Sequence, residues 1–135
     1  MIKLIIGKKG SGKTKKLVDF VNEATSKSLG NVVCIEKGDT LTFSVTHKAR
    51  LIDADAFGIS GYGEYYGLVS GIKAGNHDVT HIFGDATLRI GTRNYDELVA
   101  FLERVSKLED VEFLFTVSAD KEEIPAKVFE VCEVL

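Results

Sequence analysis

A short run near the start of the chain has the residue types that bind phosphate. Residues 7–14 fit the pattern of glycine, four residues of any type, glycine, lysine and then serine or threonine. Glycines let successive backbone N–H groups turn toward one anion at a helix N-terminus, the lysine reaches the phosphates and the hydroxyl coordinates Mg²⁺. The spacing predicts a phosphate-binding loop, with Lys13 in a catalytic role and Thr14 as a metal ligand, made of Gly7, Lys8, Lys9, Gly10, Ser11, Gly12, Lys13 and Thr14.

Two carboxylates follow apolar stretches and are candidates for metal binding and catalysis. Asp85 follows residues 79–84, and we expect it to hold Mg²⁺ through water beside Thr14. No glutamate comes after Asp85 to polarise an attacking water, so the base must come from elsewhere. Glu36, after residues 32–35, is our candidate base. Asp53 and Asp55 are alternatives, and Glu36 is otherwise a solvated carboxylate at the end of a strand.

Three further polar residues have both a functional and a structural interpretation. Ser118, after the apolar stretch 111–117, is either a sensor beside the phosphates or a helix N-cap, which is the commoner role of serine at such a position. Arg89 and Arg93 are either arginine fingers directed toward a neighbouring subunit or solvated surface residues.

The elements that must position these residues alternate between strand and helix. Apolar runs predict strands at 2–6, 32–35, 50–53, 79–85 and 111–117, and alternation of Leu41, Phe43 and Val45 predicts an additional edge strand. Helical periodicity predicts helices from residue 13, over 62–74, from an Asn94 cap onward, and a short one after 118. This order predicts an α/β fold of three layers, α/β/α, around a mainly parallel sheet.

The expected helix over 62–74 carries glycines at every fourth position. Gly63, Gly67 and Gly71 form a smooth stripe that permits close approach of another backbone. The stripe indicates either tight packing of this helix on the sheet or an interface with a second copy or a protein partner. In the second case Tyr62, Tyr65 and Tyr66 would flank the interface.

Length, composition and charge limit the class of protein. A chain of 135 residues with 44% hydrophobic and 27% charged residues fits one globular domain, 1–135. Residues 1–50 carry a net charge of +6 and residues 51–135 a net charge of −9, which sum to −3. The basic part suits an anionic ligand, and the overall acidity argues against nucleic-acid binding.

The cysteines and the apolar runs bear on metal binding and on the location of the protein. Cys34 and Cys132 lie far apart in apolar stretches, which favours buried free thiols over a disulfide or a zinc site. No apolar run reaches the roughly 20 residues of a membrane span, and no signal peptide is recognised, so we expect a cytoplasmic protein without a membrane span.

The loop at residues 7–14 and the strand ending at Asp85 together resemble those of small RecA-like P-loop NTPases. The whole chain, including the run from Gly58 to Gly63, resembles short bacterial proteins labelled ATP-binding or twitching-motility (PilT-like). This resemblance implies a RecA-like fold and binding of ATP or GTP with Mg²⁺. The part shared with pilus motors is the phosphate loop alone, so no pilus function is implied.

These observations predict an ATP-binding protein that is a slow or partner-stimulated ATPase. The alternatives are a nucleotide-binding regulatory module that does not hydrolyse ATP and a small nucleoside kinase, although the zinc-ribbon cysteines of thymidine kinases are absent. Because no Asn-Lys-x-Asp guanine motif occurs, we expect ATP rather than GTP.

Overall fold

One parallel sheet organises the computed structural model, which describes residues 1–135. All strand pairs are parallel, and the strands lie in the order β3-β2-β4-β5-β1-β6. The alternation in the sequence therefore correctly predicted a parallel sheet. The six strands are β1 (Ile2–Gly7), β2 (Asn31–Glu36), β3 (Arg50–Asp53), β4 (Val79–Gly84), β5 (Glu112–Ser118) and β6 (Cys132–Val134).

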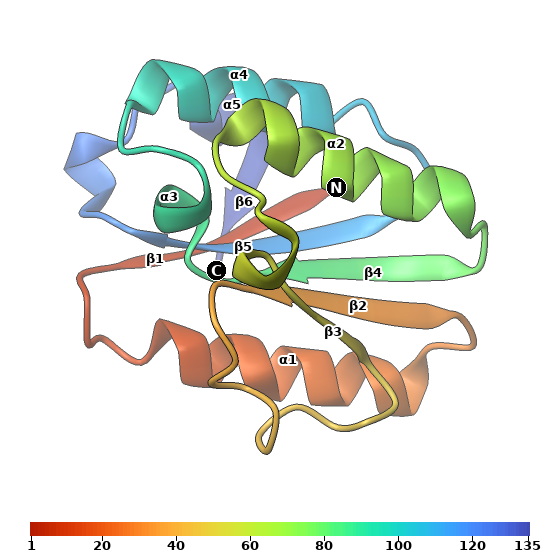
Figure 1. The fold of residues 1–135 in the computed structure, drawn as a ribbon. Coiled ribbons are helices and arrows are strands. Elements are labelled where there is room, and N and C mark those ends of the chain that lie inside the picture. Colours follow the sequence, from red (N-terminus) through yellow and green to blue (C-terminus); the bar gives the residue numbers. More distant parts are fainter.

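Helices cover both faces of this sheet and make the three expected layers. Figure 1 shows α1 on one face, and α2, α4 and α5 on the other. The α-helices are α1 (Lys13–Lys27), α2 (Tyr62–Gly75), α3 (Thr87–Ile90), α4 (Tyr95–Val105) and α5 (Val128–Val131), and the 3₁₀ turns are η1 (Asp55–Phe57) and η2 (Lys121–Glu123).

Each face of the sheet has its own apolar core. Alternate side chains of a strand point to opposite faces, so Leu4 joins the larger cluster beneath α2 and α4, whereas Ile5 joins the smaller cluster beneath α1. Leu17 and Val21 of α1 are fully buried in that smaller cluster. Burial on both faces explains why the strands read as continuous apolar runs rather than as alternating ones.

The strand order brings the chemically interesting residues to one edge of the sheet. β5 pairs with both β1 and β4, with Gly7 opposite Ser118 and Gly84 opposite Phe115. Because the strands are parallel, their carboxyl ends lie together, so the segments that follow β1, β4 and β5 meet there. Ligands of open α/β sheets bind at this edge.

The edge strand predicted between residues 37 and 50 is wrong. Residues 40–44 form turns, in which the N–H groups of Ser44 and Val45 donate to the carbonyl of Leu41. Leu41 and Val45 are buried in the cluster beneath α1, while Phe43 is fully exposed. The alternating pattern arose from a turn whose residues four apart face the core.

Helix α2 is present, but the packing interpretation of its glycines is wrong. A Cβ atom added at Gly63, Gly67 or Gly71 would meet no atom within 4 Å, so the stripe faces solvent and not the sheet. The side that packs on the sheet instead carries Tyr62 and Tyr65, both buried, which removes them from any interface. An interface through the glycine stripe stays a prediction.

The remaining elements agree with the sequence except at short segments. Asn94 caps α4 by accepting a hydrogen bond from the N–H of Glu97 at 3.1 Å. The last helical region is short, as expected, and it is followed by β6, which the sequence did not predict. Cys34 and Cys132 are free and buried, as expected. None of the helices combines the length and apolar character that a membrane span requires.

Candidate functional site

The segment between β1 and α1 is a turn built on glycines. Gly10 and Gly12 have φ angles of +85° and +87°, in the left-handed region that other residues rarely adopt. The Ser11 N–H donates to the carbonyl of Lys8 at 3.1 Å and closes the turn. These glycines therefore let the chain reverse directly into α1.

The N-terminus of α1 is left free to bind an anion. Gly12 is its N-cap and provides no side-chain hydrogen bond, and the first turn holds no acidic residue. The first N–H groups of a helix lack intrahelical acceptors and carry the positive end of the helix dipole. This end of the 15-residue helix is therefore suited to bind an anion.

Lys13 lies within the loop rather than on the surface. It is 7% exposed, and its Nζ donates to the carbonyl of Lys8 at 2.9 Å. Burial lowers the pKa of Lys13, and the negative charge of Asp85 partly opposes this effect. The amine is therefore held close to the loop and faces a carboxylate.

Asp85 follows β4 and joins three elements through its carboxylate. The Thr14 hydroxyl lies 3.1 Å from Oδ2 and 3.3 Å from Oδ1. The Thr116 hydroxyl donates to Oδ1 at 2.6 Å and accepts a hydrogen bond from the N–H of Ala86 at 3.1 Å. Thr116 of β5 thus orients Asp85 toward Thr14 at the start of α1.

Ala86 has an unusual backbone conformation beside this carboxylate. Its φ of 54° and ψ of 42° are left-handed, which is uncommon for a residue other than glycine. The bond from its N–H to Thr116 stabilises this conformation. The turn at Ala86 directs the chain from β4 into α3.

These groups line one cavity of about 490 Å³, which is within the range of small-ligand sites. Ala86 is the one hydrophobic residue among its walls, and Asp85 is their one acidic residue. Ser118 also lines the cavity, and the N-cap of the neighbouring η2 is Asp120, so the cap interpretation of Ser118 is wrong. The cationic walls are Lys9, Lys13, Lys15, Arg89 and Arg93.

The predicted loop residues divide into two groups. Lys9, Gly10, Gly12, Lys13 and Thr14 line the cavity. Gly7, Lys8 and Ser11 do not, and they shape the loop instead: a Cβ on Gly7 would collide with the Ser11 hydroxyl, while Lys8 provides the carbonyl that binds Lys13.

Glu36 lies at the end of β2, outside the walls of this cavity. It is 2% exposed, and its Oε1 accepts hydrogen bonds from the N–H groups of Thr40 and Leu41, at 3.0 and 3.2 Å, and from the Thr40 hydroxyl at 3.3 Å. Burial raises the pKa of Glu36, while these hydrogen bonds act in the opposite direction. In this arrangement Glu36 holds the turn after β2, and it is not a solvated strand-end carboxylate.

The alternative bases, Asp53 and Asp55, are engaged in the same neighbourhood. Asp53 Oδ1 accepts from the N–H groups of Gly38 and Asp55, at 2.8 and 2.9 Å. Asp55 pairs with Lys37 at 2.6 Å. Neither carboxylate lines the cavity at the glycine loop.

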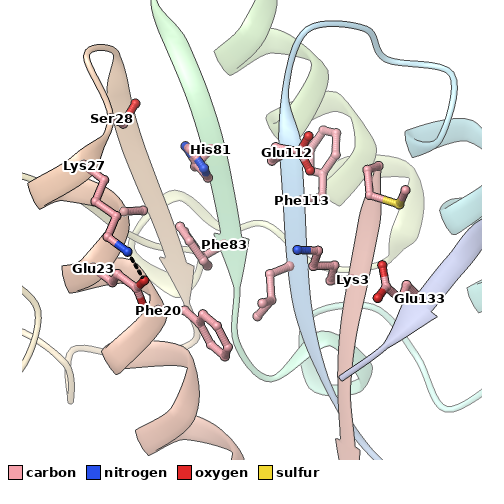
Figure 2. A pocket seen from close by; sticks show the side chains of 13 residues that line it. Lys3, Phe20, Glu23, Lys27, Ser28, His81, Phe83, Glu112, Phe113 and Glu133 are labelled. Atoms are coloured by element: carbon pink, nitrogen blue, oxygen red, sulfur yellow. Dashed lines mark hydrogen bonds and ion pairs between the residues drawn. The ribbon is translucent and has the colours of Figure 1, made fainter.

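A second, larger cavity of about 650 Å³ lies beside α1, away from the loop. Figure 2 shows that Phe20, Glu23 and Lys27 of α1 face side chains of the sheet there. Its walls mix charges of both signs with apolar groups, and its one ion pair joins Lys27 to Glu23 at 2.6 Å. It contains neither a glycine turn nor a free helix N-terminus, so the smaller cavity is the better candidate for chemistry.

Comparison with known proteins adds no functional assignment. No family model matches this chain, and no curated protein matches it significantly. The function must therefore be argued from the cavity itself.

Two contributions to this cavity were not predicted from the sequence. Thr116 is a polar residue inside an apolar strand and is 2% exposed, a combination that could have indicated a buried partner. The arrival of Arg89 and Arg93 at the same cavity as Lys13 depends on the path of the chain through α3, and no sequence signal indicated it.

Proposed function

We propose that this chain is a RecA-like P-loop protein that binds Mg-ATP through residues 7–14. One observation carries the proposal: the glycine turn, the Lys13 amine and the Thr14–Asp85 pair face a single cavity of about 490 Å³. The excess of cations on its walls favours a polyanionic ligand.

Each group has a chemical role toward a triphosphate. The free N–H groups at the start of α1 would bind phosphate oxygens. Lys13 would move its hydrogen bond from the carbonyl of Lys8 to a phosphate oxygen, which is the stronger acceptor because it is charged. The Ser118 hydroxyl, on the strand between β1 and β4, is a further polar group on this wall.

Thr14 and Asp85 would hold the magnesium ion. A hydroxyl and a carboxylate are the hard oxygen ligands that Mg²⁺ prefers, and they already lie 3.1 Å apart. Water and phosphate oxygens would complete the coordination of the ion. When bound, the ion neutralises charge on the phosphates.

The surroundings of the cavity favour slow hydrolysis or none. Asp85 is the one carboxylate on its walls, and it is already bound by Thr14 and Thr116. Glu36 is bound to the turn at residues 40–41 instead of facing the cavity. A nucleotide-binding module that does not hydrolyse ATP is therefore the second candidate. A slow ATPase that a partner stimulates also fits this cavity, because the partner would supply the missing base. No observation favours a nucleoside kinase.

The test is calorimetric titration of the purified protein with ATP, ADP and GTP, with and without Mg²⁺. We expect Mg-dependent binding that weakens by about tenfold or more in Lys13→Ala, because a charge-assisted bond to phosphate is lost. Lys16→Ala is the matched control, since Lys16 is on the same helix and outside the cavity. If the wild-type protein binds none of the three nucleotides, the proposal is wrong.

Hydrolysis is tested separately with Glu36→Gln. If Glu36 is the base, this variant binds ATP normally and loses turnover. Turnover that is equal in Glu36→Gln and the wild type would exclude Glu36 as the base. No turnover in either protein, at any protein concentration, would support the module without hydrolysis.

A further inference from the structure

Two guanidinium groups on the cavity wall have no partner within the protein. The guanidinium groups of Arg89 and Arg93 form no ion pair and no hydrogen bond. By contrast, Arg104 lies 3.8 Å above the Tyr66 ring, and Lys15, on the same cavity wall, pairs with Asp19 at 3.3 Å. The two guanidinium groups are therefore available to a ligand in this cavity.

The backbone that carries these arginines is firmly anchored. Arg89 is flanked by Leu88 and Ile90, which are 4% and 1% exposed and belong to the core beneath α2 and α4. The carbonyl of Ile90 accepts a hydrogen bond from the N–H of Gly61 at 2.8 Å. Arg89 is thus an exposed residue on a segment whose neighbours cannot move freely.

Arg93 is fixed in a similar way from the other side. The carbonyl of Thr92 accepts a hydrogen bond from the Tyr62 hydroxyl at 2.7 Å, and Asn94 caps α4. Gly91 lies against the ring of Tyr62, with no room for a Cβ. The two long basic side chains therefore extend from an anchored segment, and this segment follows directly after Asp85.

We propose that Arg89 and Arg93 bind the terminal phosphate of a nucleoside triphosphate in the same chain as Lys13. This inference rests on the proposed function and adds a ligand preference to it: the arginines make the site selective for triphosphate over diphosphate. Guanidinium groups suit this role because their planar N–H pairs match phosphate oxygens and always carry charge. No second subunit is needed to supply these charges, whereas one of the two interpretations of the sequence directed them toward a neighbouring subunit.

The first test measures the affinities for Mg-ATP and Mg-ADP in Arg89→Ala, Arg93→Ala and Arg89→Lys. Each alanine variant should weaken Mg-ATP binding about tenfold and leave Mg-ADP binding within about twofold. Arg89→Lys should recover part of the loss through its charge. Arg50→Ala, an exposed arginine outside the cavity, is the control. An equal loss for both nucleotides, or no loss, overturns the inference.

The second test asks whether the arginines act within one chain. Lys13→Ala protein, which keeps both arginines, is added in excess to Arg89→Ala protein, and Mg-ATP affinity is measured again. Affinity should stay at the level of Arg89→Ala alone, and recovery of wild-type affinity would show that the arginine comes from another copy. The two proposals fail in different ways. If the wild type binds ATP, Lys13→Ala does not, and the arginine variants bind normally, this inference is refuted and the proposed function is not.

Discussion

Replacement of Thr116 by valine tests whether the Thr116 hydroxyl holds Asp85 in place, because valine keeps the shape of the side chain and removes the hydroxyl. Thr116 is 2% exposed, and its hydroxyl makes two hydrogen bonds: it donates to Asp85 and accepts from the Ala86 N–H. Both bonds are lost in Thr116→Val, and the Ala86 N–H is left without its partner at a part-buried position.

The expected cost follows from these two bonds. A bond to a charged carboxylate contributes about 1.5 kcal/mol at the low end, which applies because Asp85 is only half-buried, and an N–H left without a partner at a part-buried position costs about 1 kcal/mol. We expect the free energy of unfolding to fall by about 2.5 kcal/mol, and the melting temperature by about 10 °C for a chain of this size.

Urea unfolding followed by circular dichroism measures this change. Thr42→Val is the matched control, since the exposed Thr42 hydroxyl donates only to the nearby Asp39 carbonyl at 3.3 Å, and it should cost less than about 0.5 kcal/mol. In the same Thr116→Val protein, Mg-dependent ATP binding should weaken because Asp85 is no longer held toward Thr14. A Thr116→Val protein as stable as the control would refute the reasoning.

Three other predictions concern pH, helix stability and thiol reactivity. Burial raises the pKa of Glu36, so the contribution of this group to stability is fully present below its unfolded pKa and is lost as pH rises through its folded pKa. Glu36→Gln should flatten this part of the stability profile, as measured by urea titrations between about pH 4 and pH 8. Gly67→Ala should stabilise the protein by about 1 kcal/mol, because the added Cβ enters open space on a helix. Gly84→Ala should destabilise the protein strongly, because the added Cβ would collide with Tyr65 and Phe115. Thermal melts of the two variants should therefore shift in opposite directions. Burial raises the pKa of Cys34 and Cys132 to about 12, so both thiols should react with Ellman's reagent only after unfolding, and rapid reaction of the native protein would contradict this burial.

The sequence predicted the residues whose signals are local. The glycine spacing at residues 7–14 and the apolar run before Asp85 each occupy fewer than ten residues, and their meeting follows from the parallel strand order. The partners of Glu36 could not be predicted, because they are backbone N–H groups of a turn that resembles a strand in sequence. Helix α3 and strand β6 are too short to show a period.

The α2 glycines show where a pattern had two physical explanations. Spacing of four residues places them on one face of a helix, but it does not say whether that face meets the sheet or solvent. Tyr62 and Tyr65, the larger apolar groups, occupy the packed side because their burial contributes more free energy. The sheet-facing side of α2 was therefore decided by the tyrosines.

The position of β1 has a consequence for how the chain folds during synthesis. This strand comes first in the sequence, yet its two neighbours in the sheet are β5 and β6, which span residues 112–134. Until those residues leave the ribosome, Ile2, Leu4 and Ile5 have no strand beside them, and exposed apolar strands attract chaperones or aggregate. Limited proteolysis of ribosome-bound chains of increasing length should show protection of β1 only after residue 134 has emerged. The glycine turn is thus translated among the first segments of the chain and becomes fixed in place among the last.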